Sequence, residues 1–364
     1  MRLEHIKIEN FRNLSDISLE LDPGTCAIIG RNAQGKTNLL ESVYVLALGK
    51  SFRVPKYREM ISYEKQRSVI TAQILGEGLP FELKVVLDSK EGKAIYKNGV
   101  RLQKLSDFLG LFRVVLFCPE HLSLVKDGPS KRRSFLDGAI CQIRPYFASM
   151  LNEFNKIEAQ RAALLKQTAK KDIPEELFSV WNERLASISV KIACIRADYI
   201  NLLKEKAPIE FSNISGGKET LFLRYVSDVY RENMSREEME KEYLNLLKAN
   251  FVSDKKYGYT VKGVHRDDLE ILVNEKSAKS YASQGQQRSV VLSLKISEGE
   301  ISKEMTGKDP IYLLDDVLSE LDEERREYIT KGLVGKQVIL TGTDEEDFSF
   351  ASQKIKIEKG EIKN

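Results

Sequence analysis

The sequence predicts an α/β fold that combines a central sheet, an antiparallel β layer and an inserted, mainly helical lobe. Residues 26–29 form an apolar strand that leads through a glycine-rich loop into a helical pattern over residues 38–47. Residues 113–117 and 310–314 are nearly continuous apolar stretches, as expected for strands covered on both faces. Between residues 140 and 206 apolar side chains recur every three or four positions, which is typical of long amphipathic helices.

The composition is that of a soluble globular protein. The 364 residues are 42% hydrophobic and 30% charged, enough for about two domains with a large core. The net charge of +3 argues against a polybasic tail but permits a local basic face. Cysteines stand singly in apolar segments at Cys26, Cys118, Cys141 and Cys194. We therefore expect buried thiols in a reducing compartment.

The sequence predicts neither a zinc site nor a segment that enters a membrane. The three histidines have no metal-ligand spacing, so the sequence does not predict a zinc site. No apolar run approaches the roughly 18 residues of a membrane span, and residues 1–8 alternate like a strand rather than a signal peptide. We expect a cytosolic protein with no membrane partner.

The glycine-rich loop fits the pattern G-x-x-x-x-G-K-[ST] in full. It reads Gly30, Arg31, Asn32, Ala33, Gln34, Gly35, Lys36, Thr37. The glycines let successive backbone N–H groups point inward, and the following helix adds the positive end of its dipole. Lys36 is expected to neutralise the β- and γ-phosphates, and the Thr37 hydroxyl to ligate Mg²⁺. Because a strand and a helix flank the loop, it predicts a nucleotide site rather than a chance turn.

The segments around this loop are predicted to be strands, followed by a basic loop. Residues 3–8 and 17–21 alternate like two strands. After the first helix, cations interleave with aromatic residues at Lys50, Phe52, Arg53, Lys56, Tyr57 and Arg58. This mixture suits contact with a DNA backbone and stacking on bases. A solvated basic loop explains it equally well, and both interpretations stay open.

An antiparallel layer is predicted between residues 68 and 100, with a hairpin turn at Asn98 and Gly99. Residues 113–117 are predicted to lie at the centre of the main sheet. Polar Glu120 follows that strand, at the end where ligands bind in open α/β sheets, and is a candidate to sense Mg²⁺ or the γ-phosphate.

A basic cluster begins the next helix. Ser130 is predicted to be its N-cap. Lys131, Arg132 and Arg133 would then lie in the first turn, where the helix dipole disfavours cations. A DNA phosphate or an ion pair with Asp137 would offset this. The ion pair is the preferred interpretation, and Lys131 and Arg132 remain DNA candidates.

Two antiparallel helices are predicted to form a short hairpin. Apolar residues recur at steps of three and four at Leu177, Trp181, Leu185, Ile188, Ile192, Ile195, Tyr199 and Leu202, and an earlier stripe contains Phe147, Leu151, Phe154 and Ile157. Residues 170–174 separate the two stripes, which indicate core packing and not a cofactor site. Residues 210–229 are then expected to return to strand and turn, residues 236–251 to form a helix, and residues 263–273 to enter a strand pair with its turn at Asn274.

A second set of motifs lies near the C-terminus. Ser283 and Gly285 open a helix, whose N-terminus is suited to bind an anion. The strand over residues 310–314 is predicted to pair beside the phosphate-loop strand and ends in Asp315 and Asp316. Asp315 would hold Mg²⁺ opposite Thr37, and Asp316 would position or deprotonate the attacking water. Thr341, at the end of a further strand, and Gln286 are assigned to the nucleotide site.

The order of these motifs resembles the RecF family of bacterial recombination proteins, in the SMC-like branch of ABC-type ATPases. The resemblance covers essentially the whole chain. Walker A is residues 30–37, the signature 283–287, Walker B 313–316 and the D-loop 319–322; residues 10–13, 49–53 and 265–268 also resemble the family. Asp316 replaces the usual glutamate, which implies slow turnover, and no glutamine stands near Glu120 where that class has its Q-loop.

The resemblance implies an ABC-type ATPase head with a mixed sheet, its two parts at residues 1–140 and 256–364, and a helical second lobe at residues 141–255. Each ATP would bind between Walker A of one subunit and the signature of another, with Ser283 and Gly285 contacting the γ-phosphate in trans. Lys36, Asp316, Ser283 and Gly285 would be the catalytic residues, with ATP and Mg²⁺ as cofactors. The ATP-dependent homodimer would bind duplex DNA at gaps or junctions, with RecR and RecO as partners. It would help to load RecA in DNA repair, replication and the SOS response, and slow ATP hydrolysis would release it.

Four alternative functions would require features that differ from those of this sequence. An ABC transporter subunit would need a Q-loop and a membrane partner, and a structural SMC clamp would need arms of hundreds of residues. A nuclease-linked repair ATPase would need a separate nuclease chain, because the sequence contains no metal-nuclease cluster. A P-loop GTPase would need an N-K-x-D motif, which is missing from the sequence.

Overall fold

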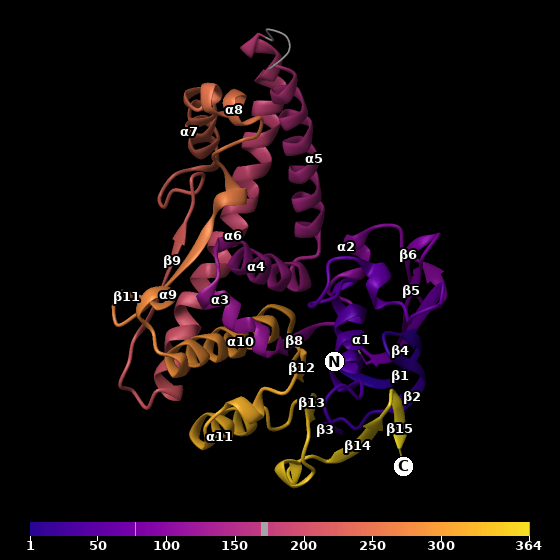
Figure 1. Ribbon diagram of the computed structural model, residues 1–364. Coiled ribbons are helices and arrows are strands. Elements are labelled where there is room, and N and C mark those ends of the chain that lie inside the picture. Colours follow the sequence, from indigo (N-terminus) through magenta and orange to yellow (C-terminus); the bar gives the residue numbers. More distant parts are fainter. Residues whose placement is uncertain (77, 169–173, 364) are drawn as a thin grey trace.

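The computed structural model describes residues 1–76, 78–168 and 174–363, and within them the chain forms three β-sheets and a helical lobe (Figure 1). Figure 1 shows the sheets that carry the two chain termini on one side and a tall helical arm on the other. In these ranges no helix is long and apolar enough to cross a membrane.

The central sheet has the order β15-β14-β3-β13-β12-β8. Its strands are β3 (Thr25–Ile29), β8 (Val114–Phe117), β12 (Ile311–Leu314), β13 (Val338–Gly342), β14 (Gln353–Glu358) and β15 (Glu361–Lys363). All pairs are parallel except β14 with β15. The expected pairing of residues 310–314 beside the phosphate-loop strand is wrong, because β13 lies between β12 and β3.

β8 is an edge strand, which corrects its predicted central position. It is nevertheless buried on both faces: Val114 and Leu116 join one hydrophobic cluster, and Val115 and Phe117 join another. Helix α10 (Gln284–Thr306) contacts it. A continuous apolar stretch therefore indicates that both faces of a strand are buried, and it does not indicate where the strand lies in the sheet.

The predicted antiparallel layer is confirmed, with the order β2-β1-β4-β5-β6-β7. Its strands are β1 (Arg2–Phe11), β2 (Leu14–Glu20), β4 (Arg67–Leu75), β5 (Pro80–Asp88), β6 (Gly92–Lys97) and β7 (Val100–Arg101). Burial alternates along β4, as expected for a sheet with one face on the core. Asn98 and Gly99 both have positive φ in the predicted hairpin turn. Helix α1 (Lys36–Leu48) contacts strands of both sheets, so it is buried almost all round.

The helical hairpin is also confirmed: α5 (Tyr146–Gln167) packs against α6 (Ser179–Ile214). Residues 170–173 of the predicted separator lie outside the described residues. Leu177 is 59% exposed and precedes α6, so it is not part of the seam, and Phe178 is buried instead. α6 continues to residue 214, where strand was expected. It accommodates Pro208 and packs along α10, which overrides the local helix-breaking signal.

The remaining elements complete the lobe and connect the sheets. The helices are α2 (Leu105–Phe108), α3 (Ser123–Lys126), α4 (Pro129–Ile143), α7 (Arg236–Ala249), α8 (Phe251–Tyr257), α9 (Ala278–Tyr281) and α11 (Glu323–Gly332). Short 3₁₀ turns are η1 (Tyr57–Met60), η2 (Pro119–Leu122), η3 (Glu175–Phe178), η4 (Val264–Arg266), η5 (Leu318–Glu320) and η6 (Glu346–Phe348). β9 (Leu221–Val226), β10 (Asp268–Val273) and β11 (Lys276–Ser277) form the third sheet, with the predicted turn after Val273.

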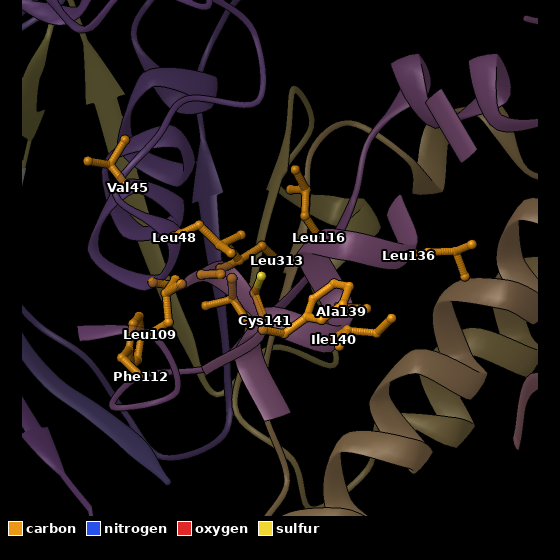
Figure 2. Close-up of a cluster of buried hydrophobic side chains, with 14 of the residues drawn as sticks. Val45, Leu48, Leu109, Phe112, Leu116, Leu136, Ala139, Ile140, Cys141 and Leu313 are labelled. Atoms are coloured by element: carbon orange, nitrogen blue, oxygen red, sulfur yellow. The ribbon is translucent and has the colours of Figure 1, made fainter. Parts of the chain in front are cut away.

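One continuous core joins the central sheet to the helical lobe. Figure 2 shows Leu48 of α1, Leu116 of β8 and Leu313 of β12 beside Ala139, Ile140 and Cys141 of α4. All four cysteines are free thiols, and Cys26, Cys118 and Cys141 are buried. Burial raises the pKa of Cys26 and Cys141 to about 12, so both stay protonated near neutral pH.

Candidate nucleotide-binding site

The phosphate loop connects β3 to α1, as predicted, and both of its glycines are required by the backbone. A Cβ at Gly30 would lie 2.4 Å from the carbonyl oxygen of Ile357. Gly35 has φ +114°, and a Cβ there would lie 2.8 Å from Leu14 Cδ2. A side chain at either position would displace the loop from the neighbouring strand or open its turn.

Lys36 is held inside the loop. Its side chain is buried, and Nζ donates hydrogen bonds to the carbonyl oxygens of Gly30 (2.6 Å) and Arg31 (3.3 Å). The N-cap of α1 is Gly35, so no side chain caps the helix, and its first turn contains no acidic residue. The positive end of the helix dipole and the Lys36 ammonium therefore act on the same small volume, which suits a polyphosphate.

The Walker B acid reaches the phosphate loop across β13. The Thr37 hydroxyl donates a hydrogen bond to Asp315 Oδ1 at 2.9 Å, and the Thr341 hydroxyl donates to the same oxygen at 3.0 Å. Burial raises the pKa of Asp315, and hydrogen bonds from the two threonines partly oppose that rise. A hydroxyl and a carboxylate at this separation offer the hard oxygen ligands that Mg²⁺ takes alongside phosphate oxygens.

Asp316 borders a cavity of about 230 Å³ that also contacts Asn32 of the phosphate loop, Ser319 of the D-loop and Thr341. Its backbone is left-handed, with φ +50°, and its N–H donates to Thr341 Oγ1 at 2.9 Å. Asp tolerates this conformation better than most residues. Thr341 is buried and contacts both aspartates, so it fixes the two acids in place; its assigned contact with nucleotide stays a prediction.

The signature begins α10, as predicted. Ser283 is the N-cap and forms a capping box with Gln286. The Gln286 side chain also donates to Glu219 at 2.6 Å, so it is engaged within the chain. Ser283 is exposed and Gly285 is half-buried, so another molecule can reach both. In Figure 1 the N-terminus of α10 lies on the far left, well away from α1, so one chain does not bring the signature to its own phosphate loop.

Glu120 lies in η2, directly after β8, and is exposed. Its carboxylate, together with that of Asp316, contributes to raising the pKa of Asp315, which places its charge near the Walker B acid. Its role as a sensor stays a prediction.

The predicted DNA-contact residues divide into two groups. Exposed cations stand at Lys50, Arg53, Lys56, Arg58 and Lys131. Lys50, Arg53 and Lys131 line one cavity of about 440 Å³ between α1, α4 and α10. Arg53 is held by the side chain of Asn38, at 2.8 Å. The structure therefore brings three of the six candidate cations to one surface.

Arg132 does not belong to that surface. It is buried and forms a bidentate ion pair with Asp268, at 2.6 and 2.9 Å. The predicted ion pair of this basic cluster with Asp137 is wrong, because Asp137 pairs with Arg196. The N-cap of α4 is Gly128 and not Ser130. Pro129 occupies the first helical position, so the helix begins nearer to the N-terminus than predicted.

The contacts between α11 and the signature helix had no signal in the sequence. Arg325 of α11, just after the D-loop, donates to Ser289 of α10 at 2.9 Å and pairs with Asp322. Arg288 and Glu320 lie 3.7 Å apart across the same junction. These contacts hold the signature helix and the D-loop together as one unit. Only the spatial approach of α10 and α11 reveals them.

Known proteins resemble this chain over nearly its whole length. Residues 2–363 match the family described as RecF/RecN/SMC N terminal domain. The DNA replication and repair protein RecF of Exiguobacterium sp. is 41% identical over 94% of this chain and 93% of its own length. That of Clostridium acetobutylicum is 37% identical over 94% and 93%. The solved structure of the recombination mediator protein RecF-ATP in the RecFOR pathway has a TM-score of 0.94 and 34% identity, and covers 99% of this chain and 96% of that one. An Smc head domain from Pyrococcus furiosus shares the fold, with TM-score 0.56, 15% identity and coverage of 99% and 95%.

Proposed function

This chain belongs to the RecF/RecN/SMC N-terminal domain family, and on that premise we propose that it is an ATP-dependent recombination mediator. It binds ATP with Mg²⁺, dimerises, and holds duplex DNA at gaps or at junctions between single and double strands. Slow, DNA-stimulated ATP hydrolysis then releases the dimer. The observation that carries this proposal is the pairing of a complete phosphate loop, with Thr37 against Asp315, and a signature exposed far from it.

Each residue has a defined part in this proposal. The backbone N–H groups of residues 30–37 and the Lys36 ammonium bind the phosphates. Thr37 and Asp315 hold Mg²⁺, which supplies charge neutralisation for the β- and γ-phosphates. Asp316 orients the attacking water and accepts its proton, and its fixed backbone limits how far the short side chain reaches.

Dimerisation follows from the exposed signature. Ser283 and Gly285 can meet only the phosphates of another copy, since the N-terminus of α10 is remote from α1. An isologous dimer then contains two composite sites, and loss of the γ-phosphate removes contacts from both. Nucleotide state thereby controls whether the two subunits close around DNA.

The DNA surface proposed here is the cavity lined by Lys50, Arg53 and Lys131, with Lys56 and Arg58 exposed on the loop that follows Arg53. Cations on one surface bind a phosphate backbone and make affinity dependent on salt. RecR and RecO are proposed partners, because the similar solved protein is described as part of the RecFOR pathway. The three-part division at residues 1–140, 141–255 and 256–364 is likewise a proposal.

A structural clamp of the SMC type is the second candidate, favoured by a family that includes SMC proteins and by the head fold shared at 15% identity. The hairpin argues against it. α5 and α6 have 22 and 36 residues, far short of the arms that such a clamp needs.

Sedimentation velocity with a slowly hydrolysed ATP analogue tests the proposal. The wild-type protein should shift from monomer to dimer, Lys36→Met should neither bind nucleotide nor dimerise, and Asp316→Asn should dimerise but dissociate slowly in ATP. Binding of duplex DNA should require nucleotide, favour gapped over blunt duplex, and weaken steeply with salt. A wild-type protein that stays monomeric at saturating analogue would refute the composite site.

A further inference from the structure

A row of cations and aromatic rings lies at the surface of the helical lobe, beside the end of α8. The guanidinium of Arg266 lies 5.8 Å from the ring centroid of Tyr259, that ring stacks on Tyr257 at 5.9 Å, and Lys256 Nζ lies 5.6 Å from the Tyr257 centroid. All four residues are exposed, Tyr257 by 55% and Tyr259 by 41%. We call these four residues the ladder. It adjoins α8, near the top of Figure 1 and far from α1.

Buried contacts with α5 fix the backbone that carries the ladder. Gly258 ends α8 in the left-handed conformation, with φ +73°, and a Cβ there would lie 3.1 Å from Lys166 Cγ. Beneath it, the fully buried Arg161 pairs with Asp254 at 2.7 Å and donates to Thr260 at 2.9 Å. The backbone on both sides of the two tyrosines is therefore anchored by a buried ion pair, so it loses little freedom on binding a ligand.

The motif at residues 265–268 explains why Arg266 points outward. Asp267 pairs with Arg196 at 2.8 Å, and Asp268 pairs with Arg132. His265 Nε2 lies 2.9 Å from the Thr260 carbonyl oxygen. Three residues of the motif thus face inward, and Arg266 has no ion pair with any other described residue. Lys262, nearby, pairs with Asp228 at 3.1 Å and is not counted in the ladder.

Two neighbouring rings with a cation at each end match the chemistry of a nucleic-acid strand. Phosphates are attracted to the cations. Each ring already contacts the other ring and one cation, so an unpaired base stacks on a tyrosine when the long Lys256 or Arg266 side chain moves aside toward a phosphate. Such stacking tolerates any base. A duplex offers no free base faces to such rings, and an acidic peptide would gain from the cations but not from the tyrosines. The combination therefore favours a single strand.

We propose that the ladder of Lys256, Tyr257, Tyr259 and Arg266 is a binding site for single-stranded DNA, separate from the nucleotide site and from the basic cavity near α1. The choice of DNA rests on the proposed function. In a complex with gapped DNA, this site would hold the unpaired strand while the dimer holds the duplex.

Fluorescence anisotropy of labelled oligo-dT, measured on the full chain without nucleotide, tests the site. The double variant Tyr257→Ala, Tyr259→Ala should weaken oligo-dT binding at least about fivefold, since each ring contributes a stacking contact. The double Tyr→Phe variant should bind like the wild type, because the rings remain. Tyr63→Ala, which removes a tyrosine that is 90% exposed elsewhere, is the matched control and should have no effect.

Further measurements identify the ligand. An abasic oligonucleotide of equal charge should bind more weakly than oligo-dT and should not discriminate wild type from the alanine variant. Photocrosslinking with 5-iododeoxyuridine should give an adduct at Tyr257 or Tyr259. Three results would each overturn the proposal. The abasic strand could bind as tightly as oligo-dT, or polyglutamate could compete as strongly as oligo-dT does. The alanine variant could also bind oligo-dT with wild-type affinity while its melting curve is unaltered. Analogue-driven dimerisation, measured on the same variants, reports separately on the proposed function and should be unchanged.

Discussion

Ser283→Asp tests the composite site without disturbing the fold. Ser283 caps α10 by accepting a hydrogen bond from the Gln286 N–H. Asp caps a helix as well as Ser does, so the free energy of unfolding should change by less than about 0.5 kcal/mol. The new carboxylate would, however, face the γ-phosphate of the partner's nucleotide.

The expected magnitude follows from the charges. Two unit charges about 4 Å apart repel by about 1 kcal/mol in water and about 4 kcal/mol at an effective dielectric constant near 20. A symmetric dimer has two such sites, so the analogue-driven dimerisation constant should fall at least about thirtyfold. Sedimentation velocity over a range of protein concentrations measures this constant.

Ser235→Asp is the matched control. Ser235 caps α7 with the same capping-box geometry, using Glu238 in place of Gln286. It should leave dimerisation unchanged. The reasoning would be refuted if Ser283→Asp dimerised like the wild type, or if both substitutions weakened the dimer equally.

Mixing two inactive variants separates action in trans from action in cis. A heterodimer of Ser283→Asp with Lys36→Met has one composite site with neither defect. Because neither variant dimerises well by itself, the heterodimer supplies the activity of an equal mixture, which should reach at most about half of the wild-type ATPase rate, since one of its two sites works. No recovery would mean that Ser283 acts on the nucleotide of its own chain.

Three other predictions follow from the contacts around the site and the arm. Arg325→Gln should lower the ATPase kcat several-fold with little change in melting temperature, because it loses the hydrogen bond to Ser289 that joins the D-loop to the signature helix. Arg161→Met should destabilise the chain by about 3–5 kcal/mol in urea unfolding, since it leaves the buried Asp254 carboxylate unpaired. Asp315→Asn should remove a pH dependence of stability: burial raises the folded pKa of Asp315 above 3.8, so its stabilising contribution is full below that value and is lost as pH rises through the folded pKa. Unfolding curves from acidic to neutral pH measure this difference, and parallel curves for the two proteins would contradict it.

Local patterns accounted for much of the fold. The phosphate loop, the strands between residues 68 and 100, the hairpin of α5 and α6, and the helix start at Ser283 were all predicted, because each depends on residues close together in the chain. The roles assigned to the site residues and the domain boundaries stay predictions.

The wrong predictions share one physical cause: each feature depends on contacts with residues that are distant in the sequence. Nothing local distinguishes Arg132 from its exposed neighbour Lys131; its partner Asp268 is 136 residues away. The apolar character of β8 records cover on both faces, whereas its place at the edge is decided by which strand pairs beside it. α6 runs past Pro208 because packing along α10 outweighs the lost hydrogen bond.

The sequence by itself determined most of the strands and helices and the loop that can hold a phosphate, because periodicity and backbone geometry are local properties. Only the tertiary structure decided the strand order, the partner of each buried charge and the distance between the phosphate loop and the signature. These depend on contacts between segments hundreds of residues apart, whose free energy no local pattern records.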